Sequence, residues 1–401
     1  MNRRELLLTA ALAPLLLPRL RSASAAAEAA TALPDAAAIS AAQRKLSRRV
    51  IEALTKDGAT VVISPASIAG AFSVISAGAS PEFVRAIGAM LGFADTVAAA
   101  DALAAIVRAL NQTQDEASAL AMARALVLDP ALKPSAPTLS GLRAGGVEVI
   151  DAAFGDPATL KRINAWVSAK TRNLIPVLLD ELPAQPGLIA LDALHFKDRW
   201  KRQFDAGETA ARPFHSAGGA ERTVQMMVSP EASWRFRKDE QFIAADLGYQ
   251  TDRFSLTIVT SRDKPLPAAG FDAVHSWLDG QGFDELQGQV QLPKLALSGS
   301  HDLLGVLDAL GLAPARLAPN ALAGFSDGEL AISKVVQRVE LKIDEQGTEA
   351  AAATGIGALR SLAAGDYVQM IVDKPFMFAL RDAASGLVLL SGYVADIPAA
   401  S

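Results

Sequence analysis

The sequence contains no cysteine among its 401 residues. Disulfide bonds, a thiolate nucleophile and cysteine-bound metals are therefore excluded. Histidine is also scarce, and no two of the four are close enough in sequence to form a His-x3-His zinc motif: His195, His215, His275 and His301. We therefore expect no metal and no other cofactor.

Basic charge is not in excess either. The chain has 38 Lys and Arg against 43 Asp and Glu, and its net charge of -5 lacks the basic surplus that nucleic-acid binding needs. Hydrophobic residues make up 51% of the chain and charged residues 20%, which is a globular composition with ample length for a large core. We see no internal repeat and no clear linker, which favours one folded domain.

The N-terminus has the pattern of a targeting segment. Arg3 and Arg4 precede an apolar run from Leu6 to Leu17, and Ala23-Ser24-Ala25 is a small-x-small cleavage site. The paired arginines indicate twin-Arg export by a bacterium. We expect residues 1–25 to be removed and the mature chain to be periplasmic or extracellular, without a membrane; a membrane-anchored N-terminus is the alternative. Residues 26–40 are Ala-rich and are predicted to be disordered, and residues 41–401 to form the domain.

Helices are predicted mainly in the first half of the domain and strands in the second, so the class is α+β. Ser64-Pro65 has the pattern of an N-cap followed by proline at the first helical position, and it opens an uncharged helix. A further helix is predicted over 158–179. Strands are predicted over 121–128 and 188–196, and a hairpin over 375–394.

A tract of tiny side chains follows the alternating strand Val335–Ile343. It runs from Glu345 to Thr354 and contains no Asn or Pro, which turns usually contain. A flexible Ala/Gly loop is one interpretation. The other is a segment that becomes a strand later, by slipping between two strands already packed. That second interpretation indicates a conformational mechanism and not a catalytic site.

Several motifs, in the same order and spacing, resemble those of the serpins over about residues 40–397. They are Ile63-Ser64-Pro65-Ala66-Ser67-Ile68, Ile163-Asn164-Ala165-Trp166-Val167, His195-Phe196-Lys197-Asp198-Arg199-Trp200, Val224-Gln225-Met226-Met227, Leu292-Pro293-Lys294-Leu295, the segment Ile343–Thr354, and Asp373-Lys374-Pro375-Phe376-Met377-Phe378. The resemblance implies three β-sheets, eight or nine helices and an exposed reactive loop over about 345–368.

The resemblance also implies suicide inhibition of a serine protease or, alternatively, a cysteine protease. The protease would cleave the loop, form an acyl-enzyme and be trapped when the loop inserts into the large sheet; serpin loop insertion is itself a worked example of strand addition. The inhibitor would be a monomer and its partner would be held covalently. The implied hinge comprises Glu345, Gly347, Thr348, Glu349, Ala350, Ala351, Ala352, Ala353 and Thr354.

Strand alternation supports insertion of this loop. Side chains alternate between the two faces of a strand, so one face would carry Thr348, Ala350, Ala352, Thr354, Ile356 and Ala358, none of them charged. Glu349 falls on the other face, where water can solvate it. About 14 inserted residues at roughly 3.3 Å each would carry a protease on the order of 45 Å.

The position of the cleaved bond has alternatives, because counting from the two ends of the loop disagrees. Arg360-Ser361 suits a trypsin-like pocket with a buried acid, although Arg360 would also serve as a solvated loop charge. Leu359 or Leu362 suits a chymotrypsin- or subtilisin-like protease, and counting back from Pro375 gives Ala364. A serpin that does not inhibit is a further alternative, although this hinge has no bulky, charged or proline residue on its inward face.

The resemblance places a switch region at Ser64, Ser67, Asp192 and Gln337, and places Trp200 where the loop enters. Many serpins pair an Asn and a His at the places of Asp192 and Gln337. A Gln amide can donate to an Asp carboxylate, so the chemistry of the pair still allows a bridge without a titrating imidazole. Helix capping for Ser64, close packing for Ser67 and a core position for Trp200 are the simpler interpretations.

An enzyme is the competing class. Ser261-Arg262-Asp263-Lys264 fits Ser-x-x-Lys, but it stands before Pro265 without the accompanying motifs of that chemistry, and a turn is expected there. We therefore predict no catalytic residues.

Overall fold

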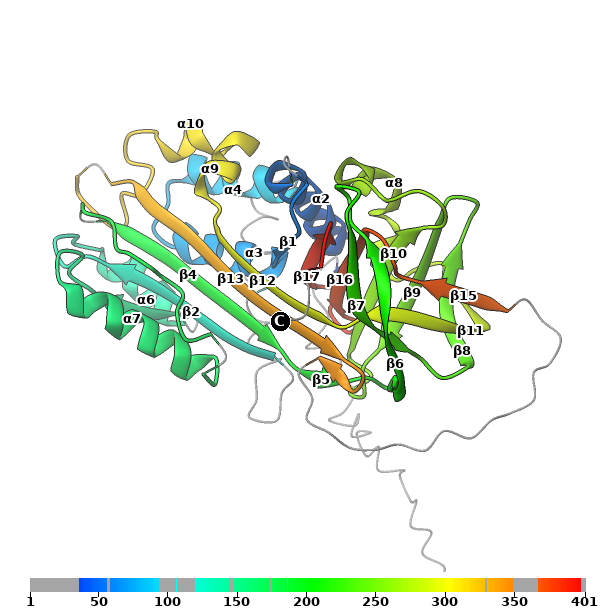
Figure 1. Ribbon diagram of the computed structural model, residues 1–401. Helices are drawn as coiled ribbons and strands as arrows, with labels where there is room; N and C mark the ends of the chain where they lie inside the picture. The colour runs from blue at the N-terminus through cyan, green and yellow to red at the C-terminus, as the bar shows by residue number, and fades with distance from the viewer. Residues whose placement is uncertain are drawn as a thin grey trace, which may run out of the picture. The chain divides into compact units, whose positions relative to one another are not determined.

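A computed structural model describes residues 36–55, 58–93, 106, 120–144, 147–173, 175–185, 187–328, 330–348 and 367–397 (Figure 1). These residues belong to one compact unit that spans 33–401. They combine helices with two hydrogen-bonded sheets, which confirms the α+β class. The predicted signal segment 1–25 lies outside the described residues.

The described ranges contain five helices of nine residues or more and three of four residues. In chain order they are α2 (Ala36–Leu54), α3 (Pro65–Ser76), α4 (Pro81–Leu91), α6 (Ala136–Ala144), α7 (Pro157–Lys170), α8 (Phe271–Val274), α9 (Leu304–Leu307) and α10 (Ala313–Arg316), with helical turns at 268–270, 277–279 and 308–312.

The start of α3 confirms the capping pattern. Ser64 is the N-cap, and its hydroxyl accepts a hydrogen bond of 3.0 Å from the Ser67 amide. Pro65 then occupies the first turn, where its missing N–H costs nothing. The capped helix is buried along most of its length.

Two helix boundaries were wrong. The first helix begins at Ala36, inside the segment 26–40 that was predicted to be disordered, so residues 36–40 are helical and Ile39 is buried in the core. The helix predicted over 158–179 ends at Lys170, because Arg172 and Asn173 adopt positive φ angles of 56° and 63°, which an α-helix cannot continue.

The seven-stranded sheet carries the site described below. Its order is β3 (Glu148–Asp151), β2 (Leu120–Leu128), β4 (Leu188–Phe196), β13 (Ile332–Asp344), β14 (Gly347–Thr348) and β5 (Asp198–Arg199), and β12 (Leu295–Asp302) pairs with β13. β4 and β13 are long parallel neighbours that lie side by side in Figure 1.

The second network has ten strands. Its order is β1 (Val61–Ile63), β17 (Val388–Val394), β16 (Phe376–Asp382), β10 (Phe254–Ser261), β9 (Phe242–Gly248), β8 (Ala232–Lys238), β11 (Asp284–Pro293), β7 (Glu221–Val228) and β6 (Asp205–His215), and β15 (Val368–Ile371) pairs with β11. β16 and β17 form the predicted C-terminal hairpin.

The sequence predicts three sheets, whereas the strands of the structure form two hydrogen-bonded networks. Dividing the ten-stranded network at β11 gives the third sheet. Residues 284–288 of β11 pair with β8, whereas residues 291–293 pair with β7. β11 therefore passes from one group of strands into another and joins them by continuous hydrogen bonding.

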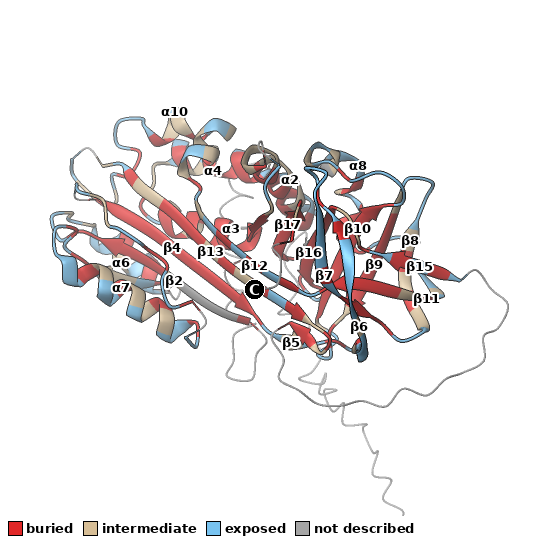
Figure 2. Ribbon diagram, viewed as in Figure 1, coloured by how far each residue is buried: buried red, intermediate tan, exposed pale blue. Residues whose placement is uncertain are grey.

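Helices cover both faces of the seven-stranded sheet, and every residue of β4 is buried (Figure 2). On one face Ala190 and Leu194 belong to the main core together with α3. On the other face Ile163 and Val167 of α7 pack with Ile189 and Leu191. A strand entering this sheet would thus be enclosed by protein on one face and partly covered on the other.

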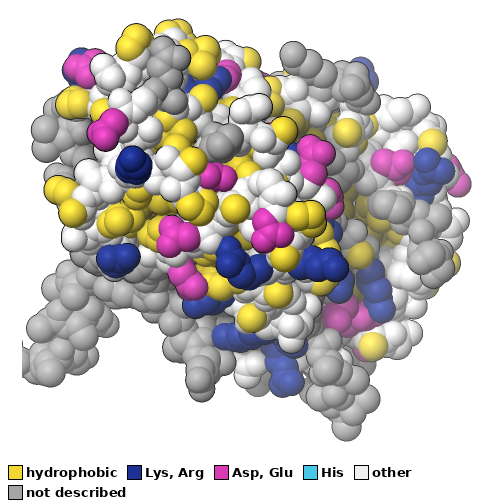
Figure 3. Space-filling model, turned by 90° about the vertical axis from the view of Figure 1, so that its left-hand side faces the viewer, with side chains coloured by type: hydrophobic (Ala, Val, Ile, Leu, Met, Phe, Trp, Pro, Cys, Tyr) yellow, Lys and Arg dark blue, Asp and Glu magenta, His cyan; other side chains and the backbone are white. Residues whose placement is uncertain are grey.

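The surface around α6 and α7 is the left-hand side of Figure 1, and Figure 3 turns it toward the viewer. Acidic and basic side chains are interspersed on it with apolar ones between them (Figure 3). Among the described helices, none is both long and apolar enough to cross a membrane.

Candidate functional site

The hinge begins where β13 turns back on itself. The Asp344 carboxylate accepts hydrogen bonds from the amides of Gln346 and Gly347, at 2.9 and 3.2 Å, and this closes a tight turn. Gly347 and Thr348 then form β14, which pairs antiparallel with Asp344 and Ile343 of β13. The turn therefore directs the chain back along the strand it has just left.

β14 also pairs on its other side with β5, through Gly347 with Arg199 and Thr348 with Asp198. The first two residues of the returning segment thus lie between β13 and β5, at the end of the sheet where β4 has given way to β5. The two residues therefore form a short strand with a partner on each side.

Gly347 fits this place because it has no side chain. A Cβ atom at this position would lie 2.1 Å from the Asp198 carbonyl oxygen, and the backbone φ is 156°. Since any Cβ would collide with the backbone of β5, only glycine allows the close approach.

Thr348 is fully buried, and its hydroxyl lies 2.8 Å from the Tyr249 hydroxyl. The Tyr249 ring stacks on the Trp200 indole, with centroids 4.5 Å apart and planes at 20°. Burial raises the pKa of Tyr249 far above its usual value, so its hydroxyl stays protonated. The aromatic pair therefore forms a neutral, rigid seat for the Thr348 side chain.

Trp200 lies against the hinge and is at the same time a core residue. Its indole nitrogen donates to the Asp344 carbonyl at 2.9 Å, and its amide donates to the Gln346 carbonyl at 2.8 Å. Only 2% of its surface is exposed. Trp200 is therefore a core residue that also contacts the predicted hinge.

Glu345 anchors the turn electrostatically. Its carboxylate lies 2.8 Å from the Lys294 ammonium and accepts a 2.7 Å hydrogen bond from Thr209. Burial alone would raise the pKa of Glu345, but the Lys294 and Thr209 hydrogen bonds outweigh it and lower the pKa below its usual value of 4.5. The carboxylate is therefore held in its charged form.

Three residues of the predicted switch region, Ser64, Ser67 and Gln337, lie together at the start of α3. The Gln337 side-chain amide bonds both main-chain groups of Ser64: Oε1 accepts from the Ser64 amide and Nε2 donates to the Ser64 carbonyl, each at 2.8 Å. Ser67 is buried in the first turn of the same helix. Gln337 therefore ties β13 to the helix beneath it.

Asp192 stands directly opposite Gln337 in the register, but the bridge between them does not form. Gln337 uses Oε1 and one of its two Nε2 hydrogens to bond Ser64, and the Asp192 carboxylate accepts a 2.8 Å hydrogen bond from Arg124 of β2. Burial raises the pKa of Asp192, while the charge of Arg124 and the Ser67 hydroxyl oppose that rise.

Sequence reasoning missed Arg124. The available signal was a single arginine within the otherwise uncharged strand Leu120–Leu128. A lone charge in a buried strand needs a partner, and Asp192 in the equally apolar β4 is that partner.

The remaining loop positions lie outside the described residues. They are Glu349, Ala350, Ala351, Ala352, Ala353 and Thr354 of the hinge, and Leu359, Arg360, Ser361, Leu362 and Ala364 around the proposed cleavage point.

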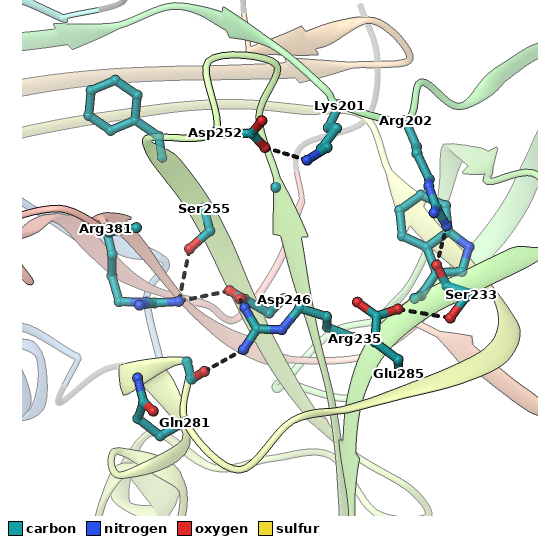
Figure 4. Close-up of a pocket in the computed structure, with 15 residues that line it drawn as sticks. Lys201, Arg202, Ser233, Arg235, Asp246, Asp252, Ser255, Gln281, Glu285 and Arg381 are labelled. Atoms are coloured by element: carbon teal, nitrogen blue, oxygen red, sulfur yellow. Dashed lines mark hydrogen bonds and ion pairs between the residues drawn. The ribbon is translucent and has the colours of Figure 1, made fainter.

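A cleft of about 420 Å³ lies between the residues that follow Trp200 and the strands β8, β9 and β10 (Figure 4). At its floor Asp246 accepts hydrogen bonds from Arg235 and Arg381, at 2.6 and 2.8 Å. At its rim Lys201 pairs with Asp252, and Glu285 accepts from Ser233. With Arg202, four basic and three acidic side chains line the cleft, and the pairing among most of them favours a structural role.

No group of three acidic or histidine side chains that could hold a metal occurs within the described ranges. The described residues therefore supply no candidate metal site, and the sequence has no His-x3-His zinc motif.

Known proteins were then compared with the chain. The family model for Serpin (serine protease inhibitor) matches residues 41–397. Iripin-5 of Ixodes ricinus is 28% identical over 354 residues, which cover 83% of this chain and 88% of that protein. The leukocyte elastase inhibitor of Bos taurus is 31% identical over 245 residues, 58% of this chain and 65% of that protein.

Solved structures show the same fold. Tengpin, a thermophilic serpin in its native state, superposes with a TM-score of 0.79 over 89% of this chain and 93% of its own, at 21% identity. Serpin48 of Tenebrio molitor gives 0.76 over 90% and 98%, at 24% identity.

Proposed function

This chain belongs to the serpin family, and we propose that it is a suicide inhibitor of a serine protease. In this proposal the protease cleaves the loop between β14 and β15 and forms an acyl-enzyme. The loop then inserts between β4 and β13 and traps the protease. The chain would act as a covalent trap and not as an enzyme.

One observation carries the proposal: Gly347 and Thr348 already lie between β13 and β5. The pairing can be extended, because each step forward along β14 is one step back along β13. From Ile343 opposite Thr348, residue 350 would then meet Leu341 and residue 352 would meet Val339. Both partners are buried on the face toward α3, so the small uncharged side chains would be the ones enclosed.

The same extension of the pairing supports the assignment of Glu349 to the solvent-facing side of the strand. Glu349 would lie opposite Lys342 on one side and Lys197 on the other, and both lysines are exposed. Opposite charges on neighbouring strands contribute roughly 0.2–1 kcal/mol per pair. Insertion in this register would therefore bring the Glu349 carboxylate between two cations.

For the target we propose a trypsin-like protease that cleaves Arg360-Ser361. Arg360 is the only basic side chain from Glu345 to Val368. Cleavage at Leu359, Leu362 or Ala364 by a chymotrypsin-like, subtilisin-like or cysteine protease is the alternative. Mass spectrometry of the C-terminal fragment released by each protease distinguishes these bonds.

We further propose that the chain is exported to the periplasm or beyond the cell after removal of residues 1–25, and that it acts as a monomer. N-terminal sequencing of the protein recovered from the exported fraction tests the first statement. Light scattering tests the second.

The main test is incubation with trypsin-, chymotrypsin- and subtilisin-like proteases, followed by a denaturing gel. We expect an SDS-stable complex with at least one of them. The cleaved form should also unfold at a much higher temperature than the intact form, because insertion adds a strand to the sheet. Cleavage without a complex and without a rise in stability would identify a serpin that does not inhibit.

A further inference from the structure

Three polar side chains form a row across the buried face of the seven-stranded sheet. Arg124 of β2 stands directly opposite Asp192 of β4, and Asp192 stands directly opposite Gln337 of β13. At the two ends of the row, Arg124 lies against Gly70 of α3 and Gln337 bonds Ser64, the N-cap of the same helix. The boundary between β4 and β13, which we call the seam, passes between Asp192 and Gln337.

Asp192 and Gln337 do not bond each other across the seam, because each has another partner. Asp192 is bound to Arg124 at 2.8 Å, and the two side chains are 2% and 8% exposed. Gln337 is bound to Ser64 through both amide atoms. The two polar groups that face each other across the seam therefore each bond to a different partner and not to each other.

The position of Arg124 is also fixed from below. A Cβ atom on Gly70 of α3 would lie 2.5 Å from Arg124 Nη2 and 2.7 Å from its Cζ. Glycine in a helix interior costs about 1 kcal/mol relative to alanine, so its presence here requires a reason. The reason is that the guanidinium lies against the helix backbone at this point, where it can reach Asp192.

We propose that Arg124 is a positioning residue for the opening of the sheet. It holds the Asp192 carboxylate on the β2 side, so that β4 and β13 separate without breaking a hydrogen bond between Asp192 and Gln337. The inference rests on the proposed function, since only loop insertion requires the seam to open. In this proposal the buried ion pair prevents a side-chain hydrogen bond between β4 and β13, where the loop would enter.

The first experiment compares two double variants. Arg124→Met with Asp192→Asn removes both charges and leaves the new side-chain amide at position 192 free to bond Gln337 across the seam. Arg124→Gln with Asp192→Asn is the matched control, because the introduced glutamine can still bond the introduced asparagine and hold it on the β2 side. Replacing a buried ion pair as a whole is often neutral for stability. In urea, the free energies of unfolding of both variants should therefore be close to that of the wild type.

The measurement is the rate at which each intact protein takes up a synthetic peptide of residues 348–359, followed by native gel and by thermal stability. We expect the Met/Asn variant to take up the peptide about tenfold more slowly, the factor for one hydrogen bond of about 1.4 kcal/mol. The Gln/Asn control should stay within about twofold of the wild type. Equal rates for all three proteins, or a faster Met/Asn variant, would overturn the proposal.

A second measurement needs no variant. Some β4 amides bond to β2 and others to β13, so one strand reports on both boundaries. By NMR-detected hydrogen exchange, we expect the amides in the β4–β13 ladder to exchange faster than those in the β2–β4 ladder. Equal or reversed protection contradicts the inference, even if a variant fails to fold.

The two failures are distinguishable. If the wild type takes up no peptide and forms no protease complex, the proposed function is wrong, and the exchange measurement alone decides whether the seam is the weaker boundary. If the wild type takes up peptide and the Met/Asn variant does so equally fast, the proposed function stands and the role of Arg124 does not.

Discussion

The Thr348 and Tyr249 hydroxyls lie 2.8 Å apart, and neither side chain has any exposed surface. This contact joins the hinge to the end of β9, 99 residues earlier in the chain. It shows that the hinge is already seated in the sheet up to Thr348, so insertion would continue from a formed first step.

Removing this contact should cost a modest amount of stability. Tyr249→Phe and Thr348→Val each delete one hydroxyl, and each should lower the free energy of unfolding by about 1 kcal/mol. The double variant should lose less than the sum, because the two deletions remove the same bond. Urea unfolding of the four proteins gives the coupling, and strictly additive losses would show that the contact contributes nothing.

A charge at position 348 should separate cleavage from inhibition. Thr348→Arg places a guanidinium where the side chain is fully buried, so the hinge can neither keep its place nor insert. We expect the variant to be cleaved at the wild-type rate without an SDS-stable complex. Thr348→Ser, which keeps the hydroxyl, should still form the complex. A Thr348→Arg complex at the wild-type yield would contradict the seating of this residue.

Gly347→Ala should displace the hinge from the sheet. The new Cβ would collide with the Asp198 carbonyl, and strain of this kind costs of order 1–3 kcal/mol. We expect lower stability and faster proteolysis of the loop. Gly141→Ala is the control, because a Cβ there meets nothing within 4 Å and lies in α6, where alanine favours the helix. Similar effects of the two substitutions would argue against close packing at Gly347.

Glu345 should make stability depend on pH in the acid range. Its pKa is lowered in the fold, so its contribution is fully present above the usual pKa of 4.5 and is lost as the pH falls through the lower value of the folded state. Glu345→Gln should therefore be less stable than the wild type at neutral pH, and the difference should shrink below pH 4.5. A difference that stays constant down to that range would mean that the Lys294 contact contributes no stability.

Local patterns identified most of the elements. The Ser64-Pro65 cap and the alternating hairpin strands depend on neighbours in sequence, and both were correct. The end of α7 was wrong because hydrophobic spacing continues past Lys170, while two residues with positive φ angles end the helix. Periodicity does not reveal a change of backbone conformation that is set by tertiary packing.

The candidate site depended more on distant contacts. The inward face of the hinge could be assigned by alternation, but one of the two partners of β14 is the pair Asp198 and Arg199, about 150 positions earlier in the chain. Whether Asp192 and Gln337 bond each other also depended on distant residues. Arg124 and Ser64 come from other parts of the chain, and each takes one of the two partners.

The direction of two strands has a final consequence. β4 and β13 run parallel, whereas β14 runs antiparallel to both of its neighbours. One complete added strand would replace a parallel ladder with two antiparallel ladders, which are slightly more stable per residue. We therefore expect the fold described here to persist because of a barrier and not because it is the deepest free-energy minimum. Its apparent melting temperature should accordingly depend on the heating rate, as for proteins whose stability is kinetic.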